Sequence, residues 1–409
     1  MPHPNADLSY PDDLLLPFYP SIADLADRLR AALGENGTPL YVADSQIIAD
    51  RYQAMAHSLQ ESWGPYTIGY SFKTNYGVAR HRVLMDQGAW AEVVSAREYQ
   101  MALDQGYPRN RIIYNGPYKD DASLQLALAG RSLLNINDFD ELARVIELAD
   151  AQAEVCSLGI RVTSDLPRLG LSRFGFSMDN EEAQDAVAQI RQHPQLKLCG
   201  IHTHLYGDTD DPEIYGVAAQ RVGQFAQQHF ADCGETLQYI DVGGGYPAHS
   251  PKPKSRDQWQ PQPIDVYVAH VSRALSPFFP ERDSRPTLIM EPGRYLTCDA
   301  IVLITRVVHV KQRFDKQIVV CDGSISMVPL THYSPQVIRL YAADLSPRET
   351  RNRVATSIQG ATCRENDSLY EGPFPTVHVG DLLIHFAAGA YNANLAPNFI
   401  FSVPKTVFI

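Results

Sequence analysis

The sequence predicts an α/β protein: a (β/α)8 TIM-like barrel joined to a smaller, mostly antiparallel β domain. Three observations predict this fold. The chain has 409 residues, which suffices for a large barrel and a second domain. Short β-rich runs alternate with helical segments from about residue 66 to residue 290, as in a parallel barrel. Near residue 295 this alternation stops, and strand-like runs then follow one another without full-length helices between them.

The alternating region contains eight β-rich runs. Between them, the segments 142–149 and 183–190 carry apolar residues at the spacing of one helix face. Eight strands with intervening helices fit a closed barrel. A doubly wound open sheet is the alternative, because a single sequence does not define the number of strands. The runs are 66–72, 89–94, 111–115, 132–136, 157–162, 196–204, 237–242 and 287–290.

The flanking segments predict the second domain. A strand at 38–44 and a helix at 47–63 precede the barrel runs. Turns rich in Pro, Gly and Asp separate the strand-like runs that follow the barrel. We therefore expect a barrel over 46–295 and a β domain that combines 1–45 with 296–409. The later runs are 301–310, 316–323, 376–386 and 399–409.

The charge balance argues against binding to nucleic acid or to an anionic membrane. The chain has 35 basic and 47 acidic residues and a net charge of -12, so such polyanions are repelled. No apolar stretch approaches the length of a membrane span, and residues 1–20 lack the features of a secretory signal. The six cysteines are scattered, without a CxxC pair or a zinc-site spacing. We expect a soluble protein in a reducing, cytoplasmic setting.

Polar and glycine residues lie at or just after the C-terminal ends of several predicted barrel strands. These strand ends meet on one rim, where barrel enzymes build their active sites. The coincidence is therefore more informative than any single motif. The residues are Lys73, Glu92, Asn115, Arg161, His204, Gly243, Gly244, Gly245 and the segment 291–294.

Three of these features have both a chemical and a plain structural explanation. Lys73 in partly apolar surroundings would have a lowered pKa and could form a Schiff base, although an isolated strand-end lysine is more often an ordinary one. The glycines at 243–245 expose N–H groups that suit a phosphate, or they only make a tight turn. Glu291 and Arg294 could hold a ring nitrogen protonated and bind that phosphate, or they form a surface ion pair.

His202 and His204 alternate on one strand and share a face, so they could chelate a metal ion. The spacing shows no third ligand, and we expect no metal site. The alternative is that an imidazole face lies against a flat cofactor.

Together these segments resemble the fold-type III (alanine-racemase-like) class of pyridoxal-phosphate enzymes, specifically the diaminopimelate/ornithine decarboxylase family. The resemblance extends over nearly the whole chain, and several short motifs occur in the same order with the barrel period between them. The motifs are Tyr-Ser-Phe-Lys-Thr-Asn (70–75), Gly-Ile-His-Thr-His-Leu (200–205), Asp-Val-Gly-Gly-Gly-Tyr-Pro (241–247), Glu-Pro-Gly-Arg-Tyr (291–295), Gly-Ala-Thr-Cys-Arg-Glu-Asn-Asp (360–367) and Ala-Gly-Ala-Tyr-Asn (388–392).

The resemblance implies pyridoxal 5'-phosphate as the cofactor and assigns residues to its ring. Lys73 would hold the aldehyde as a Schiff base, His204 would stack on the ring and Glu291 would pair with the ring nitrogen. Arg161 would lie near the ring hydroxyl. A carboxylate opposite the ring nitrogen preserves the electron sink, so Glu291 favours decarboxylation over racemisation.

The resemblance also implies phosphate ligands and a shared active site. Gly243 to Gly245, Arg294 and Tyr391 would bind the phosphate. The segment that contains Glu92, Ser95 and Glu98 would lie near the cofactor, with Glu92 where aspartate is more usual. Cys363 of the partner subunit would protonate the carbanion after carbon dioxide leaves. The implied assembly is a head-to-tail homodimer with two shared active sites.

Two departures from the family pattern bear on the substrate. Meso-diaminopimelate enzymes carry an arginine in the segment matching 326–333, where this chain has none and only Tyr333 aligns easily. Next to Cys363 the family usually has an acid, but this chain has Arg364, with Glu365 and Asp367 as acids that could compensate. An arginine there would attract a carboxylate and repel an amine.

We therefore predict that neither meso-diaminopimelate nor ornithine is the best substrate. An amino acid with an acidic or conjugated side chain, as in siderophore or antibiotic pathways, fits better. The alternatives are an amino-acid racemase on the same fold, a diaminopimelate decarboxylase of lysine biosynthesis, a non-catalytic cofactor carrier, and a metal-dependent hydrolase that uses His202 and His204.

Overall fold

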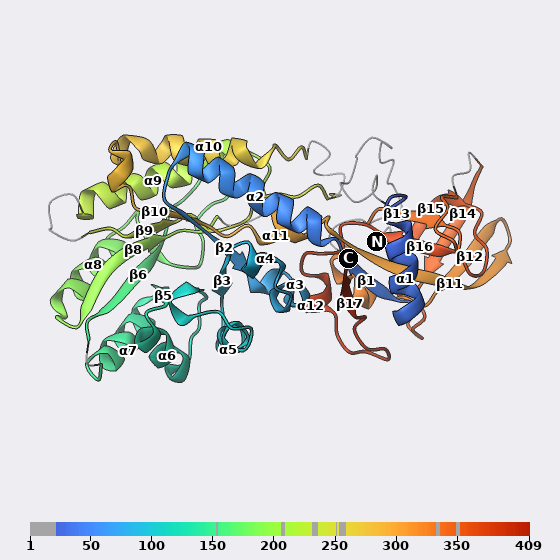
Figure 1. Cartoon of the computed structure of the whole chain (residues 1–409), viewed down its shortest axis with the longest axis horizontal. Helices are drawn as coiled ribbons and strands as arrows, with labels where there is room; N and C mark the ends of the chain where they lie inside the picture. The colour runs from blue at the N-terminus through green and yellow to red at the C-terminus, as the bar shows by residue number, and fades with distance from the viewer. Residues whose placement is uncertain are drawn as a thin grey trace.

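The structure, a computed structural model, contains two β-sheets at opposite ends of its long axis, the barrel on the left of Figure 1 and the second sheet on the right. None of the helices in the described part of the chain combines the length and the apolar character that a membrane crossing requires. The described residues are 22–152, 154–205, 209–230, 236–250, 252, 259–332, 336–348 and 352–409.

The first sheet is a closed barrel of parallel strands. Its strands are β2 (Tyr66–Ser71), β3 (Trp90–Val93), β4 (Ile112–Tyr114), β5 (Leu133–Ile136), β6 (Cys156–Thr163), β8 (Leu196–His202), β9 (Tyr239–Asp241) and β10 (Thr287–Met290). The order is β5-β4-β3-β2-β10-β9-β8-β6, and β5 pairs with β6 to close the ring. A short strand, β7 (Phe176–Ser177), adds to β6. The predicted barrel is therefore confirmed, each of the eight predicted runs overlaps a barrel strand, and the open-sheet alternative is wrong.

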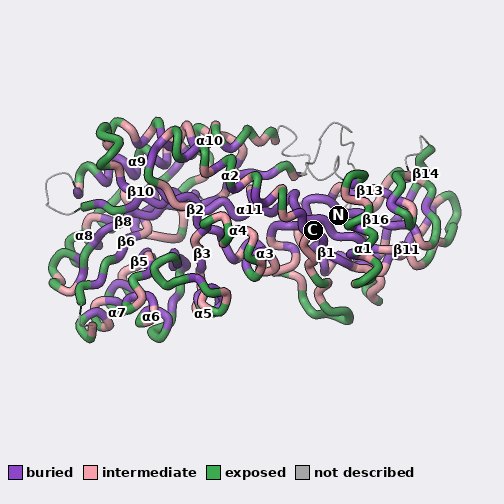
Figure 2. Tube along the Cα trace, viewed as in Figure 1, coloured by how far each residue is buried: buried purple, intermediate pink, exposed green. Residues whose placement is uncertain are grey.

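Helices cover the outside of the barrel, with α9 and α10 on one side and α6 and α7 on the other in Figure 1. The helices of the described residues are α1 (Ala26–Asn36), α2 (Ser45–Ser62), α3 (Tyr76–Arg80), α4 (Val83–Asp86), α5 (Ala96–Asp104), α6 (Asp121–Gly130), α7 (Phe139–Ala149), α8 (Glu182–Gln192), α9 (Pro212–Phe230), α10 (Ile264–Leu275), α11 (Gly293–Thr297) and α12 (Asn392–Leu395), and of these α1 packs against the second sheet. Acidic caps start several of them; Asp138, for example, accepts from the Glu141 N–H at 2.9 Å before α7. Both predicted apolar stripes face inward, and Figure 2 shows the same division between a buried inside and an exposed outside.

The second sheet contains β1 (Leu40–Ala43), β11 (Ile301–Arg313), β12 (Lys316–Cys321), β13 (Ile338–Tyr341), β14 (Arg353–Gln359), β15 (Ser368–Pro375), β16 (Leu382–His385) and β17 (Thr406–Phe408). Most pairs are antiparallel, but β12–β14 and β1–β17 are parallel. Because β1 pairs with β11 and β17, the segment before the barrel joins this sheet. Residues 1–21 of the predicted N-terminal part lie outside the described residues.

Three strands of this sheet, β13, β14 and β15, were not predicted from the sequence. β13 has only four residues, β14 mixes charged, polar and apolar residues, and β15 contains proline, so no clean alternation identifies them. Two predicted strands are also shorter than expected. The runs 376–386 and 399–409 contain strand only at β16 and β17, because turns such as the one at Gly380, where φ is 93°, occupy the rest.

The β domain contacts the barrel beside the turn that carries Lys73. Asn75 Nδ2 donates to the Gly389 carbonyl at 2.7 Å, and the Tyr391 N–H donates to the Thr74 carbonyl at 2.8 Å. Asn394 Nδ2 donates to the Lys73 carbonyl at 2.9 Å. The segment after β16 therefore holds the lysine turn from the side of the second sheet.

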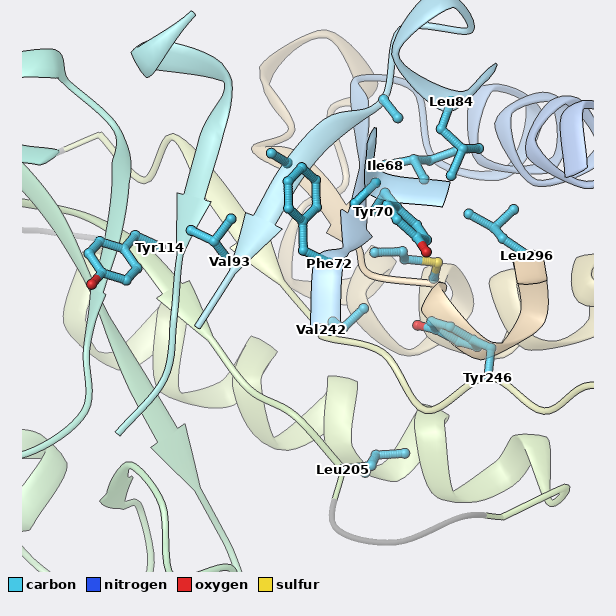
Figure 3. Packing of buried hydrophobic residues seen from close by; sticks show 14 of the residues in the cluster. Ile68, Tyr70, Phe72, Leu84, Val93, Tyr114, Leu205, Val242, Tyr246 and Leu296 are labelled. Carbon is cyan, nitrogen blue, oxygen red and sulfur yellow. The ribbon is translucent and has the colours of Figure 1, made fainter. Parts of the chain in front are cut away.

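A packed apolar base supports the same turn. Tyr70 and Phe72 are fully buried on either side of Ser71, and Figure 3 shows them within the cluster that also contains Leu296 of α11. The Tyr70 hydroxyl donates to the Asn75 carbonyl at 3.0 Å. Burial of two aromatic rings and this hydrogen bond fix the backbone from which Lys73 projects.

Candidate active site

Lys73 lies at the barrel rim in a short 3-10 turn that directly follows β2. Its Nζ forms an ion pair with Glu92 Oε2. The two residues come from neighbouring parallel strands, since Ser71 of β2 is in register with Glu92 of β3. The Lys73 side chain is 31% exposed and that of Glu92 is 1% exposed, so the carboxylate lies beneath the amine.

The charge state of Lys73 differs from the sequence prediction. Burial alone would lower the pKa of Lys73, but the carboxylates of Glu92 and Glu291 outweigh it and raise the pKa above its usual range. The predicted lowering is therefore wrong, and the amine is charged at neutral pH. The two carboxylates belong to β3 and to the end of β10, so their joint effect depends on closure of the barrel.

Glu291 is buried directly after β10 and carries a negative charge. Its Oε1 accepts from Asn115 Nδ2 at 2.6 Å, and its Oε2 lies 3.7 Å from His204 Nδ1. Burial alone would raise the pKa of Glu291, but His204 and Lys73 hold it below its usual range. At the end of β9, burial and the Glu291 carboxylate raise the pKa of Asp241 well above its usual range. The pKa shifts of these two acids therefore run in opposite directions, downward for Glu291 and upward for Asp241.

The two histidines differ in exposure. His204 is 27% exposed, and its Nδ1 accepts from the Gly244 N–H at 3.0 Å. His202 is buried, and burial lowers its pKa well below its usual range, so it is neutral. One ligand atom each from His202, His204 and Glu291 lie within 4.8 Å of one another, which supplies the third ligand that spacing did not reveal. A metal ion there would face the charged Lys73, and His204 Nδ1 already accepts a hydrogen bond, so we assign no metal to this group.

The glycine segment after β9 differs from the predicted phosphate nest. The Gly243 N–H donates to Asp241 Oδ1 at 2.9 Å, and the Gly244 N–H donates to His204. Two of the three amide donors therefore bond to side chains, which corrects the expectation that all three are free for a phosphate. Space still requires glycine, because a Cβ on Gly244 would lie 2.3 Å from the Glu291 carbonyl oxygen. Gly243 and Gly245 have φ values of 68° and 89°, which favour glycine.

The structure brings Arg294 and Tyr391 together from the two domains. The Arg294 guanidinium carbon lies 5.5 Å from the centre of the Tyr391 ring. Tyr391 has a left-handed backbone (φ 64°) and reaches the lysine turn through its N–H. Arg161 lies farther round the rim, with its guanidinium carbon 4.8 Å from the Phe174 ring, and burial lowers its pKa.

Ser95 and Glu98 form the start of α5. Ser95 Oγ accepts from the Glu98 N–H at 3.3 Å, and the Glu98 carboxylate accepts from the Val94 N–H at 2.8 Å. The Tyr76 hydroxyl donates to the same carboxylate at 2.8 Å. Burial raises the pKa of Glu98. Through these contacts within the protein, the two residues shape the rim next to the lysine turn.

Cys363, Arg364 and Glu365 are exposed in the loop between β14 and β15. They belong to the β domain, whereas Lys73 belongs to the barrel. The Arg364 guanidinium carbon lies 5.8 Å from the centre of the Phe399 ring. Tyr333, the other predicted substrate residue of this region, lies outside the described residues.

Asp367, at the end of this loop, is buried and hydrogen-bonded within the protein. It is 1% exposed, and its Oδ1 accepts from Ser324 Oγ at 3.0 Å and from the Ile325 N–H at 2.7 Å. Its Oδ2 accepts from the Thr362 N–H at 3.1 Å and from the Thr362 hydroxyl. With both oxygens engaged, Asp367 anchors the loop and is not available to a substrate ammonium group, which corrects its assignment from the sequence.

Two residues of the barrel interior were missed by the sequence analysis. Asn135 Nδ2 donates to Asn115 Oδ1 at 2.8 Å, and the Tyr239 hydroxyl donates to Asn135 Oδ1 at 2.8 Å. Both residues are buried within β5 and β9. The available signal was a polar residue inside an apolar run, as in Ser-Leu-Leu-Asn-Ile (132–136), because a buried amide must find partners.

Comparison with known proteins gives consistent matches along most of the chain. The family model described as "Pyridoxal-dependent decarboxylase, pyridoxal binding domain" matches residues 46–298. A diaminopimelate decarboxylase from Methanothermobacter thermautotrophicus is 26% identical over 377 residues, 89% of this chain and 85% of that protein.

Solved structures show the same fold. A diaminopimelate decarboxylase from Methanocaldococcus jannaschii superposes with a TM-score of 0.81 at 22% identity, over 93% of this chain and 88% of that one. A lysine/ornithine decarboxylase from Vibrio vulnificus, complexed with putrescine, gives a TM-score of 0.77 at 22% identity, over 95% of this chain and 98% of that one.

Proposed function

Because this chain belongs to the pyridoxal-dependent decarboxylase family, we propose that it removes the α-carboxylate from an amino acid whose side chain is acidic or carries an acidic conjugate. The family makes the protein a pyridoxal-phosphate-dependent amino-acid decarboxylase. The observation that carries the finer proposal is Arg364. It is an exposed cation beside Cys363, while the nearby acid Asp367 is buried and fully hydrogen-bonded.

The described residues fit the cofactor. A buried, ionised Glu291 faces the rim, and Lys73 stands beside it. Gly244 adjoins the Glu291 carbonyl so closely that a Cβ would fill the space. When bound, pyridoxal phosphate supplies an electron sink for the pair of electrons that the departing carboxylate leaves behind.

Each cofactor contact has a candidate residue at the rim. Lys73 would hold the aldehyde, and Glu291 would face the ring nitrogen, with His204 on the ring face. Arg161 would lie near the ring hydroxyl. The residues that would border the phosphate are Gly243, Gly244, Gly245, Arg294 and Tyr391. The N–H groups of Gly243 and Gly244 already donate to Asp241 and His204, so among the three glycines the N–H of Gly245 would be the one to face the anion.

The chain's own residues fix the charges around this site. Lys73 Nζ holds its proton against Glu92 Oε2, so this carboxylate keeps the amine charged and fixes its position at the rim. Although burial alone would raise the pKa of Glu291, His204, His202 and Lys73 keep it below its usual range, and the Asn115 amide donates a hydrogen bond to its Oε1. An ionised carboxylate at that position supports decarboxylation and argues against the racemase alternative.

We propose that the active enzyme is a head-to-tail homodimer in which Cys363 of the partner subunit donates the proton that replaces the lost carboxylate. Two observations support this assembly. Cys363 is the exposed one of the five free cysteines that the structure describes. Phe399, which Arg364 contacts, and its sequence neighbours Leu395, Ile400 and Phe401 are large apolar residues that are also exposed.

The substrate class follows from charge. The described residues 324–332 contain no lysine or arginine that could hold the distal carboxylate of meso-diaminopimelate. Arg364 would repel the distal ammonium of ornithine and attract a carboxylate. Diaminopimelate decarboxylase is the second candidate, because relatives 26% identical over 89% of this chain carry that name.

The test is carbon dioxide release from a panel of amino acids. It contains ornithine, lysine, meso-diaminopimelate, glutamate and amides that join a diamino acid to a dicarboxylic acid. We expect an acidic member to be turned over fastest, and R364E to lower its kcat/KM at least ten-fold. The matched control is R353E, which reverses the charge of an exposed arginine on β14 and should leave kcat/KM unchanged. Fast turnover of meso-diaminopimelate would establish the second candidate instead.

A further inference from the structure

We infer that Asn115 is a positioning residue that ties the carboxylate paired with Lys73 to the carboxylate facing the cofactor ring, and that Asn135 and Tyr239 set its orientation. This inference deepens the proposed function and rests on it. Hydrogen bonds and the space inside the barrel carry it.

One amide group bridges two carboxylates. Asn115 Nδ2 donates to Glu291 Oε1 at 2.6 Å and to Glu92 Oε1 at 3.2 Å. The other oxygen of Glu92 pairs with Lys73, and the other oxygen of Glu291 faces His204. Asn115 therefore binds one oxygen of each acid. The other oxygen of each acid lies beside Lys73 or His204, the two residues that would contact the cofactor.

The amide orientation is defined by its partners. An ionised carboxylate can only accept, so the NH2 group of Asn115 must face Glu291 and its Oδ1 must face Asn135. Asn135 Nδ2 donates to that oxygen at 2.8 Å, and Asn135 Oδ1 in turn accepts from the Tyr239 hydroxyl at 2.8 Å. Because the phenol supplies a single proton, the three residues form a chain of donors that runs toward the two acids.

The barrel makes room for this chain with two glycines. A Cβ on Gly159 would lie 2.3 Å from the Tyr239 hydroxyl oxygen and 2.4 Å from Asn135 Oδ1. A Cβ on Gly200 would lie 2.0 Å from Tyr239 Cζ. Two neighbouring strands thus lack side chains where the phenol and the amide meet, which indicates that the interior is built around these contacts.

The bridge has a chemical consequence. Without the Asn115 N–H groups, the two buried carboxylates lose a hydrogen-bond donor that stabilises their negative charges. The pKa of Glu291 therefore rises toward its usual range. A protonated Glu291 no longer stabilises a protonated ring nitrogen. Asn115 does not touch the reacting atoms, and it acts through Glu291 and Glu92.

The test uses the full-length protein loaded with pyridoxal phosphate and needs no substrate. The visible absorption of the bound cofactor is titrated with pH, and the affinity of the cofactor-free protein for pyridoxal phosphate is measured. N115D replaces the donor with a third acid, and Y239F removes only the distant phenol. The matched control is Y114F, which loses a buried tyrosine–serine hydroxyl contact of 2.9 Å outside this chain of residues.

We expect N115D to weaken cofactor affinity at least ten-fold and to move the acid transition of the absorption band to higher pH. Y239F should move the transition in the same direction by less, and Y114F should leave both measurements as in the wild type. Unchanged titrations in both N115D and Y239F overturn the inference, as does a Y114F shift equal to that of Y239F. If N115D does not fold, the comparison of Y239F with Y114F still decides. Failure of the wild type to bind pyridoxal phosphate would instead refute the proposed function.

Discussion

Lys73 and Glu92 form an ion pair between neighbouring barrel strands, with the amine at the rim and the carboxylate buried beneath it. The pair, helped by Glu291, raises the pKa of Lys73. An amine must lose its proton before it can attack an aldehyde, so this contact opposes cofactor loading at neutral pH while it fixes the position of the lysine.

E92Q should therefore speed the loading of pyridoxal phosphate onto the cofactor-free protein near neutral pH. Loss of the carboxylate lowers the pKa of Lys73, and a larger fraction of the amine is then unprotonated. The rate of appearance of the visible absorption band measures this effect. A loading rate equal to that of the wild type at every pH would contradict the expectation.

The same substitution should lower the free energy of unfolding of the cofactor-free protein by about 1–3 kcal/mol, less than for a fully buried pair because Lys73 is partly exposed. Since the folded-state pKa of Lys73 is raised, this contribution is present at neutral pH and is lost only as the pH rises through that folded-state pKa. E371Q breaks the more exposed Lys316–Glu371 pair and is the control, with a smaller effect expected in urea unfolding.

G244A should disrupt the rim. Its Cβ would lie 2.3 Å from the Glu291 carbonyl, which is backbone and cannot yield easily, so strain of about 1–3 kcal/mol and weaker cofactor binding are expected. G34A is the matched control. That position lies inside α1 with nothing within 4 Å of the new Cβ, so it should stabilise the protein by about 0.5–1 kcal/mol. Thermal unfolding and cofactor titration measure both variants; equal effects would contradict the steric argument.

Mixing two inactive variants tests the shared active site. K73A lacks the cofactor lysine, and C363A lacks the proposed proton donor. If each site combines Lys73 with Cys363 of the partner subunit, a mixed dimer has one intact site, and random mixing restores about one quarter of wild-type activity. Carbon dioxide release after subunit exchange measures this recovery. Activity that stays at the level of the separate variants would show that the two residues are not shared between subunits.

Acidification should destabilise the β domain through His385. Burial lowers the pKa of His385 to about 3, so the folded protein keeps it neutral while the unfolded chain binds a proton below about 6.5. Its contribution to stability is therefore present above that pH and is lost as the pH falls toward the folded-state pKa, by up to about 1.4 kcal/mol per pH unit.

The measurement for this histidine is the midpoint of urea unfolding between pH 7 and pH 5. H385L removes the titrating group and should flatten the dependence relative to the wild type. H309Q changes an exposed histidine of β11 and should keep the wild-type slope. Identical slopes in H385L and the wild type would show that His385 does not set this dependence.

The barrel and the positions of several rim residues were predictable from the sequence. Each of the eight β-rich runs overlaps a barrel strand, because the alternation of strands and helices is local information that each segment carries. The positions of Lys73 and Glu291 also followed from sequence, since a residue directly after a barrel strand lies at the same rim as every other strand end. The strands β13 to β15 were not predicted, because β13 is very short, β14 mixes polar and apolar residues, and β15 contains proline.

How these residues influence one another depends on the three-dimensional fold. The raised pKa of Lys73 requires Glu92 and Glu291 on the same side of a closed ring, and the sequence predicted the opposite direction. The burial of Asp367 depends on a segment more than forty residues away, at Ser324. The chain from Tyr239 through Asn135 to Asn115 joins strands far apart in the sequence. Charge and hydrogen bonding act over a few ångströms of space, and a linear pattern does not record which distant residues the fold brings within that range.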